Sequence, residues 1–435
     1  MTSRILIKGA TIITMNDYDE VISPGDLLIE NDIIKTISRE KTNVAENDTV
    51  DTIIEGEGKV LIPGLINLHN HAAMSLFRSY ADDLPLKEWL EKKIFPAEAK
   101  LTGEDVFWGT SLSLLEMLRG GTTTFVDMYY YMDEVARACL DGGIRAVLSH
   151  GIVGINSLLA YKTLQGAKDF VSNWGNEGNG RIKAIFGPHA PYTCPPDYFK
   201  KVLKETEQFD NAFFHIHLAE SRQEMKESLE KHQKTPVGLM QEIGLFERPV
   251  LAAHCVHVTD EDIDILVNQK VGISHNPGSN LKLGSGIAPL TKMMDKKARL
   301  GLGTDGPASN NNLDMFEEIR LSSILQKGYH ENPTLICAEE ALGMATRGGA
   351  RALNIDNIGV LREGAKADIA LLDFKKPHLQ PHASPIANIV YSASSNDVEA
   401  VIVDGKILVE KGSFLTLDEE KIYYEAAKSA ERLRQ

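Results

Sequence analysis

The segment Leu65-Ile66-Asn67-Leu68-His69-Asn70-His71 leads from an apolar, strand-like stretch directly into two histidines. His69 and His71 are two residues apart, so in a β-strand both side chains point to the same side. Seven later apolar runs also end at a histidine or an acid, at Asp127, His150, His189, His217 with Glu220, His254, His275 and Asp305. Helix-length segments separate these runs. The alternation predicts an α/β fold, a closed parallel (β/α)8 barrel with its polar residues gathered at one face.

Two β-rich ends flank the predicted barrel. Residues 4–62 contain short alternating runs with turn residues, and the same texture returns after residue 357. Asp404-Gly405 is a hairpin signal, and residues 419–434 form a charged amphipathic pattern typical of a surface helix. We therefore expect residues 1–62 and 358–435 to build one small β-sandwich domain, and residues 63–357 to form the barrel.

Composition indicates an ordinary soluble globular protein. The 435 residues carry 61 acids against 46 bases, a net charge of −15, which argues against nucleic acid or an anionic membrane as the partner. Four scattered cysteines form no Cys-x-x-Cys pair, and no apolar run has membrane-spanning length. A reducing cytoplasm is the expected location.

A metal site follows from the residues at the strand ends. His69, His71, His217 and Asp305 offer three imidazoles and one carboxylate, a donor set that suits a hydrolytic metal ion with one position left open for water. Glu220 comes three residues after His217, so it can face that water without binding the metal. A single His-x-His motif is weak, because histidines recur by chance; the set at successive strand ends supports the prediction.

These motifs resemble those of the amidohydrolase superfamily. The resemblance rests on His69-Asn70-His71, His217-x-x-Glu220, His254-Cys255, Ser274-His275-Asn276-Pro277 and Thr304-Asp305-Gly306, and it covers nearly the whole chain. Within the superfamily the sequence is most similar to the 5-methylthioadenosine/S-adenosylhomocysteine deaminases. The resemblance implies a distorted (β/α)8 TIM barrel, a flanking β-sandwich and one divalent metal held by His69, His71, His217 and Asp305.

The position of one lysine in the fourth strand indicates how many metal ions the site holds. Superfamily members with two metals bridge them through a carboxylated lysine at the end of the fourth strand, whereas here Lys183 opens that strand and His189 closes it. We therefore expect one divalent ion per subunit, with Zn2+ first and Fe2+, Mn2+ or Ni2+ as alternatives, because imidazole and carboxylate suit all of them.

The resemblance also implies a metal-dependent aminohydrolase. Hydroxide produced from water at the metal would attack the purine carbon that bears the 6-amino group. Glu220 would protonate ring N1 and pass a proton to the departing ammonia, His254 would stabilise the attacking oxygen, and Asp305 would accept the water proton as well as bind the metal. The expected product is the inosine analogue.

Several further residues are candidates for substrate contacts. Glu98 resembles the family residue that binds the ribose hydroxyls, Trp89 the pocket aromatic, and His189 the residue facing the nucleoside; surface or core roles are the alternatives for each. His275 is expected to border the pocket. His150 stands where many relatives carry an arginine for a homocysteine carboxylate, which makes S-adenosylhomocysteine less favoured than 5-methylthioadenosine or adenosine.

The same motifs are compatible with two other functions. A second reading is another hydrolase with the same core, acting on guanine, cytosine or an s-triazine, including chlorohydrolases. A third is a non-enzymatic scaffold, which retention of every ligand and of Glu220 disfavours. The partner is expected to be a small-molecule nucleoside, and relatives suggest a homo-oligomer.

Overall fold

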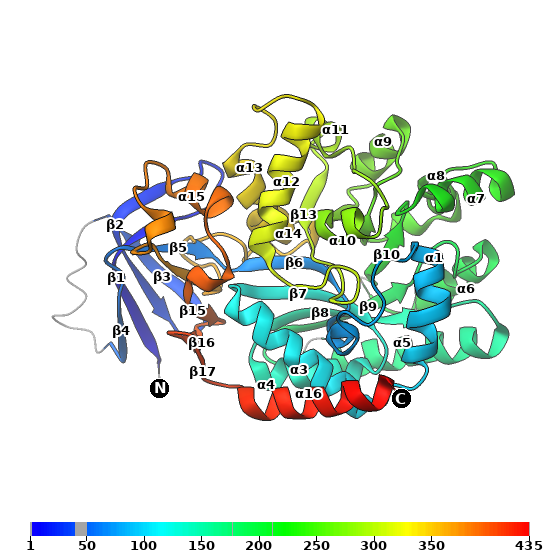
Figure 1. Ribbon diagram of the computed structural model, residues 1–435, viewed down its shortest axis with the longest axis horizontal. Coiled ribbons are helices and arrows are strands. Elements are labelled where there is room, and N and C mark those ends of the chain that lie inside the picture. The colour runs from blue at the N-terminus through cyan, green and yellow to red at the C-terminus, as the bar shows by residue number, and fades with distance from the viewer. Residues whose placement is uncertain (1, 40–49, 176, 211, 435) are drawn as a thin grey trace.

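Eight parallel strands form the centre of the molecule (Figure 1). The computed structural model describes residues 2–39, 50–175, 177–210 and 212–434. Each strand pairs with the strands of this sheet that come before and after it in the sequence. The strands are β6 (Leu65–Asn70), β7 (Thr122–Tyr129), β8 (Arg145–Ile152), β9 (Ile182–Pro188), β10 (Phe214–Leu218), β11 (Val250–His254), β12 (Gly272–His275) and β13 (Arg299–Leu302). β13 returns to β6, where the Asp305 N–H donates to the His69 carbonyl oxygen at 2.9 Å. The predicted barrel is confirmed.

Helices follow each strand of the barrel. The connection from β6 to β7 contains η2 (Ala72–Phe77), α1 (Leu86–Trp89), η3 (Leu90–Ile94), α2 (Phe95–Glu98) and α3 (Gly103–Arg119). The next strands are followed by α4 (Met132–Gly142), α5 (Ser157–Trp174), α6 (Pro196–Thr206), α7 (Arg222–His232), α8 (Pro236–Ile243), η4 (Leu245–Glu247) and α9 (Asp260–Asn268). The last group is α10 (Pro277–Lys282), α11 (Leu290–Asp295), α12 (Met315–Tyr329), α13 (Ala338–Gly343), η5 (Met344–Gly348) and α14 (Gly349–Ala352).

The two ends of the chain meet in one mixed sheet of nine strands, on the left of Figure 1. It contains β1 (Arg4–Ile13), β2 (Val21–Glu30), β3 (Ile33–Ser38), β4 (Thr52–Glu55), β5 (Lys59–Pro63), β14 (Ile369–Asp373), β15 (Val398–Val403), β16 (Lys406–Glu410) and β17 (Ser413–Phe414). The Asp404-Gly405 turn joins β15 to β16, as predicted. The strands surround their own hydrophobic cluster, which includes Ile7, Leu27 and Ile369. The terminal unit, predicted as a small β-sandwich built from both ends of the chain, is present, and its described strands belong to one mixed sheet.

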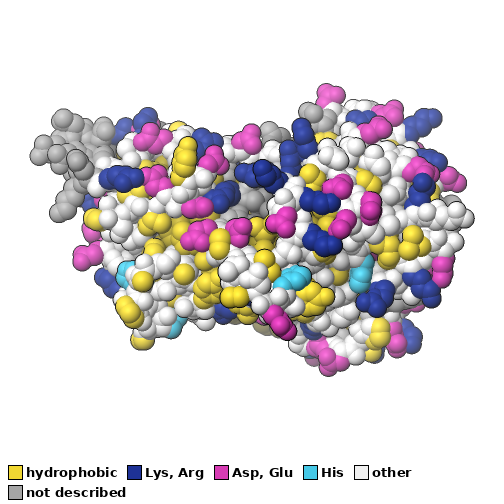
Figure 2. All heavy atoms as spheres, turned by 90° about the horizontal axis from the view of Figure 1, so that it is seen from above, with side chains coloured by type: hydrophobic (Ala, Val, Ile, Leu, Met, Phe, Trp, Pro, Cys, Tyr) yellow, Lys and Arg dark blue, Asp and Glu magenta, His cyan; other side chains and the backbone are white. Residues whose placement is uncertain are grey.

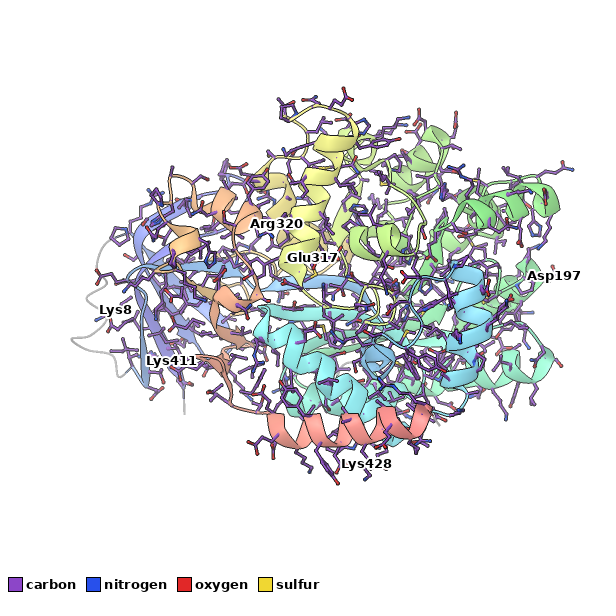
Figure 3. The ribbon with its side chains drawn as sticks, in the orientation of Figure 1. Lys8, Asp197, Glu317, Arg320, Lys411 and Lys428 are labelled. Carbon is purple, nitrogen blue, oxygen red and sulfur yellow. The ribbon has the colours of Figure 1, made fainter. Side chains whose placement is uncertain are left out.

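The C-terminal helices contact helices of the barrel. After η6 (Pro377–Leu379), α15 (Pro385–Tyr391) packs beside α12 and α13, and η7 (Ser395–Asp397) leads back to the sheet. α16 (Glu419–Arg434) runs along α3, with Ile422 and Leu433 buried and Lys428 turned outward (Figures 1 and 3). The boundaries at 62/63 and 357/358 stay a prediction, and residues 1, 40–49 and 435 of the terminal unit lie outside the described residues.

A buried ion cluster joins the terminal sheet to the barrel. Arg145, the first residue of β8, donates to both carboxylate oxygens of Asp368 at 2.8 and 3.2 Å and to Asp404 at 3.1 Å. All three side chains are buried, and the cluster lies at the amino ends of the barrel strands. The polar residues of the predicted site lie at the opposite end of the barrel, where the carboxyl ends of the strands are.

The outer surface carries mixed charges. Figure 2 shows acidic and basic side chains interspersed over the upper face, with hydrophobic side chains between them. Among the described residues, every helix is too short or too polar to cross a membrane.

Candidate active site

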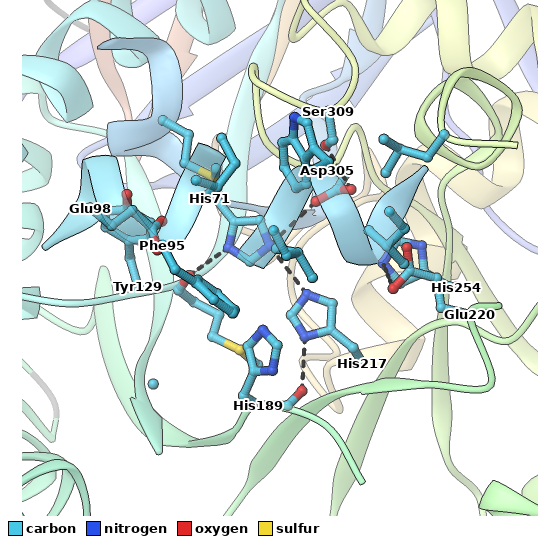
Figure 4. Close-up of a pocket in the computed structure, with 18 of the residues that line it drawn as sticks. His71, Phe95, Glu98, Tyr129, His189, His217, Glu220, His254, Asp305 and Ser309 are labelled. Carbon is cyan, nitrogen blue, oxygen red and sulfur yellow. Dashed lines mark hydrogen bonds and ion pairs between the residues drawn. The ribbon is translucent and has the colours of Figure 1, made fainter. Parts of the chain in front are cut away.

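A cavity opens at the carboxyl ends of the barrel strands (Figure 4). Eight of the predicted site residues line it: His71, Trp89, Glu98, His189, His217, Glu220, His254 and Asp305. His69 lies fully buried beside them, with its Nε2 atom 3.2 Å from Asp305 Oδ1. The structure therefore brings all four predicted metal ligands and the three predicted catalytic residues to one place.

The four ligand candidates form a cage of suitable size for a metal ion. His71 Nε2 lies 3.2 Å from His217 Nε2 and 3.3 Å from Asp305 Oδ1. Ligand atoms that each stand about 2.0–2.1 Å from a tetrahedral zinc ion are about 3.3 Å apart, which agrees with these spacings. His69 Nε2 is buried without a hydrogen-bond partner among the described residues, as expected for an atom that binds a metal. The donor set fits a divalent ion.

Hydrogen bonds at Nδ1 direct each ligand imidazole. The Nδ1–H of His71 donates to the Met128 carbonyl oxygen at 2.6 Å, and that of His217 to the His189 carbonyl oxygen at 2.8 Å. His69 Nδ1 lies 3.0 Å from His215 Nε2. With the proton on Nδ1, each ring presents the lone pair of Nε2 to the cage.

His215 continues the series of hydrogen-bonding groups from His69 to the interior of the barrel. Its Nδ1 lies 3.2 Å from Ser149 Oγ, whose hydroxyl donates to the Asp127 carbonyl oxygen at 2.7 Å. Burial lowers the pKa of His69 to about 4 and the pKa of His215 and of His217 well below the usual value. These rings are therefore neutral near pH 7, the form that binds a metal.

Asp305 divides its two carboxylate oxygens between different tasks. Oδ2 accepts hydrogen bonds from Ser279 Oγ at 2.6 Å and from Ser309 Oγ at 2.8 Å, so Oδ1 faces the histidines. Burial acts to raise the pKa of Asp305, but the adjacent imidazoles of His69 and His71 bring it well below the usual value. Asp305 is a carboxylate at neutral pH.

Glu220 and His254 lie side by side in the cavity lining (Figure 4). Their nearest atoms, Glu220 Oε2 and His254 Nε2, are 4.0 Å apart. Burial raises the pKa of Glu220. Burial acts to lower the pKa of His254, but the Glu220 and Asp305 carboxylates raise it above the usual value, and Asn280 Oδ1 lies 2.9 Å from Nδ1. In both groups the shift of the pKa favours the protonated form, as suits groups that transfer or share a proton.

A separate part of the cavity wall comes from the connection after β6. Trp89 and Phe95 line it together with Glu98. Burial raises the pKa of Glu98 to about 7, and the neighbouring Tyr129 hydroxyl acts in the opposite direction. His189 follows β9, and its Nδ1 lies 3.0 Å from Thr193 Oγ1. This wall offers one carboxyl group among aromatic and apolar surfaces.

The structure does not bring His150 to the cavity. Ser149 points into the barrel toward His215, and successive side chains of a strand face opposite sides, so His150 faces the helix layer. A Cβ atom at Gly166 in α5 would lie only 3.0 Å from His150 Nε2. The interpretation of His150 as a substrate contact is corrected: residue 151, not residue 150, lines the cavity from β8.

His275 is also absent from the cavity lining. It follows the inward-facing Ser274, is buried, and its two ring nitrogens lack hydrogen-bond partners among the described residues. Burial lowers the pKa of His275 to about 4. It is therefore not retained as a substrate contact.

Some residues that shape the site were not predicted. Ser279, Ser309 and Asn280 orient Asp305 and His254; Ser279 and Asn280 lie in α10, directly after β12, and Ser309 lies in the turn after β13. Their position shortly after the strand ends was a usable signal. The left-handed backbone conformation of Ala219, His254 and Asp305, with φ of 52°, 75° and 62°, could not be predicted from the sequence, because none of these residues is glycine.

Known proteins share this architecture over its full length. Residues 60–408 match the model of the amidohydrolase family. A 5-methylthioadenosine/S-adenosylhomocysteine deaminase of Dictyoglomus turgidum is 51% identical over 427 residues, with 98% of each chain covered.

Solved structures agree with this assignment. A zinc-bound adenosine deaminase from Xanthomonas campestris superposes with a TM-score of 0.93 at 31% identity, covering 99% of both chains. A zinc-bound atrazine chlorohydrolase from Arthrobacter aurescens reaches a TM-score of 0.90 at 25% identity, covering 98% of this chain and 100% of its own. The fold, the ligand cage and the match of the family model lead to one conclusion: the chain belongs to the amidohydrolase family.

Proposed function

We propose that this protein is a hydrolytic deaminase that converts the 6-amino group of an adenosine-type nucleoside to the inosine analogue and releases ammonia. The observation that carries the proposal is the cavity itself, where the cage, Glu220 and His254 lie opposite the carboxyl group of Glu98. The relative from Dictyoglomus turgidum and the adenosine deaminase support the same reaction class.

We infer that His69, His71, His217 and Asp305 together hold one divalent ion per subunit. Zinc is the first candidate, because two similar solved structures contain it, and iron, manganese and nickel are the alternatives. A divalent ion held there would lower the pKa of water and so supply a nucleophile at neutral pH. Lys183 supports a single ion: it lies near the start of β9, with Nζ 5.0 Å from the ring centre of Phe213.

Two side chains then transfer protons, and a third holds the attacking oxygen. Glu220, whose pKa burial raises, donates a proton to ring N1 as oxygen adds to C6, which places the charge on the enzyme rather than on the purine. His254 Nε2 holds the attacking oxygen, and Asp305 accepts the proton that this oxygen loses. The proton that Asp305 accepts passes to the exocyclic nitrogen with the help of Glu220, which is now deprotonated; the C6–N bond breaks, ammonia leaves, and a C6 carbonyl remains.

The remaining wall supports a nucleoside substrate. A carboxylate at Glu98 accepts hydrogen bonds from two neighbouring hydroxyls, the arrangement of a ribose diol. Trp89 and His189 supply flat surfaces beside the purine, and Leu86, Leu90 and Phe95 supply apolar surface for a 5′ substituent. Lysine and arginine are absent from the described lining, so a homocysteine carboxylate would find no cationic partner there. The preferred substrate is 5-methylthioadenosine.

Ammonia release from a panel of substrates tests the proposal. Metal-reconstituted protein is compared on 5-methylthioadenosine, adenosine, S-adenosylhomocysteine, guanine and cytosine. We expect the highest kcat/KM with 5-methylthioadenosine and little turnover of the free bases. Turnover of guanine or cytosine above that of every nucleoside would overturn the proposal and favour another aminohydrolase of the same family.

A further inference from the structure

Glu224 is a buried acid that none of the steps above uses. It lies in the first turn of α7 and is 6% exposed. Its Oε1 accepts a hydrogen bond from the backbone N–H of Ala219 at 3.0 Å, and its Oε2 accepts one from the N–H of Glu220 at 2.8 Å. Both carboxylate oxygens are therefore committed to the backbone that carries Glu220.

The turn held by Glu224 has an unfavourable conformation. Ala219 has a φ of 52°, in the left-handed region that side chains with a Cβ atom rarely adopt. Its carbonyl oxygen accepts a hydrogen bond from the His257 N–H at 2.8 Å. Ala219 is thus bonded on both sides, and Glu224 supplies one of the two contacts. Without it, two buried N–H groups would lose their acceptors, and the turn would gain by relaxing.

The contacts of Glu224 differ from those of an ordinary helix cap. In a capping box the acid at the third helical position accepts a hydrogen bond from the N-cap N–H. Asp262 does this in α9, where the Thr259 N–H donates to it at 3.0 Å. Glu224 holds the same position in α7, after the N-cap Ser221, but it bonds the two residues before the cap. Its carboxylate stabilises the turn at Glu220 rather than only its own helix.

We propose that Glu224 is a positioning residue that fixes the backbone at Glu220, and so holds the Glu220 carboxyl group beside His254. The inference rests on the proton-transfer role proposed for Glu220. It predicts that loss of the Glu224 carboxylate impairs the chemical step through Glu220, without affecting the metal cage or the wall at Glu98.

Glu224→Gln is the first test. The glutamine amide keeps one acceptor oxygen and turns an N–H group toward the second backbone donor. We expect kcat with 5-methylthioadenosine to fall about 10- to 100-fold, since small displacements of a catalytic group have effects of this size. KM and the metal content per chain should stay unchanged. Glu224→Asp, which keeps the charge but cannot reach both donors, should show the same loss and provides the test if the glutamine variant does not fold.

Asp262→Asn is the matched control. Asp262 is equally buried, at 2% exposed, and holds the same helix position, but its bonds do not reach the turn at Glu220. The control should lower thermal stability and leave kcat unchanged. An equal loss of kcat in the control would show a general effect of buried caps and would overturn the inference.

The double variant decides whether Glu224 acts through Glu220. In a Glu220→Gln background, adding Glu224→Gln should cause no further loss of kcat, because the group being positioned is already disabled. A second loss that multiplies the first, or wild-type kcat in Glu224→Gln alone, would overturn the inference but leave the proposed function intact. Wild-type kcat in Glu220→Gln would instead refute the proton-transfer role in the proposed function.

Discussion

Glu220 lines the cavity next to the ligand cage. Its carboxyl oxygen faces His254 Nε2 at 4.0 Å, and burial raises its pKa, as suits a proton donor. Glu220→Gln should therefore lower kcat by about 10²-fold or more, since the amide cannot transfer the proton. Metal analysis of the purified variant should give the wild-type content. Loss of metal would identify Glu220 as a ligand instead.

Glu98 should control the preference for nucleosides over free bases. If its carboxylate binds the ribose diol, Glu98→Ala removes a charged hydrogen bond worth about 1.5–3 kcal/mol, or roughly 10- to 150-fold in kcat/KM. Turnover of adenine should change far less. His150→Ala is the control, because His150 faces α5, and it should leave both substrates and the ratio of S-adenosylhomocysteine to 5-methylthioadenosine activity unchanged.

Because the pKa of Glu98 is raised, KM for 5-methylthioadenosine should depend on pH, and the charge of the carboxyl group sets the direction of the change. Burial brings the pKa to about 7, so the carboxylate dominates above this value and the neutral acid below it. The neutral acid accepts hydrogen bonds poorly, and KM for 5-methylthioadenosine should rise about tenfold as the pH falls from 8 to 6. Glu98→Gln should remove this dependence. The same rise of KM in Glu98→Gln would assign it to another group.

The order of the elements was predictable, but the side that each strand-end residue faces was not. Apolar runs and helix-length intervals were sufficient to predict the eight strands of the barrel. His150 was misplaced because the strand continues to Ile152, and alternation along it sends residue 150 outward.

The ligand cage depends on close approach of β13 to β6. A Cβ atom at Gly303 would lie 2.8 Å from the His69 backbone nitrogen and 2.5 Å from Ser274 Oγ. Gly303→Ala should push these strand ends apart and weaken metal affinity about 10- to 100-fold, the usual effect of disturbing groups behind metal ligands. Competition with a chelator measures this change. Gly328→Ala is the control, because open space surrounds Gly328, and it should bind metal normally.

At the scale of the molecule, the buried cluster at Arg145 should contribute stability rather than catalysis. Removing one partner leaves buried charges without compensation, so Arg145→Ala should lower the free energy of unfolding by about 3–5 kcal/mol. The midpoint of urea unfolding measures the effect, and kcat of the folded protein should not change. Lys226→Ala breaks the exposed pair with Glu230 and should have little effect. Equal shifts in both variants would contradict a special role for the cluster.

Titration of metal-free protein with zinc, followed by ammonia release from 5-methylthioadenosine, tests the proposed active site as a whole. The cage of His69, His71, His217 and Asp305 has room for one ion, and every proposed step depends on it. Activity should rise linearly with added zinc and reach its plateau near one ion per chain. A plateau near two ions per chain, or full activity in the metal-free protein, would contradict this assignment.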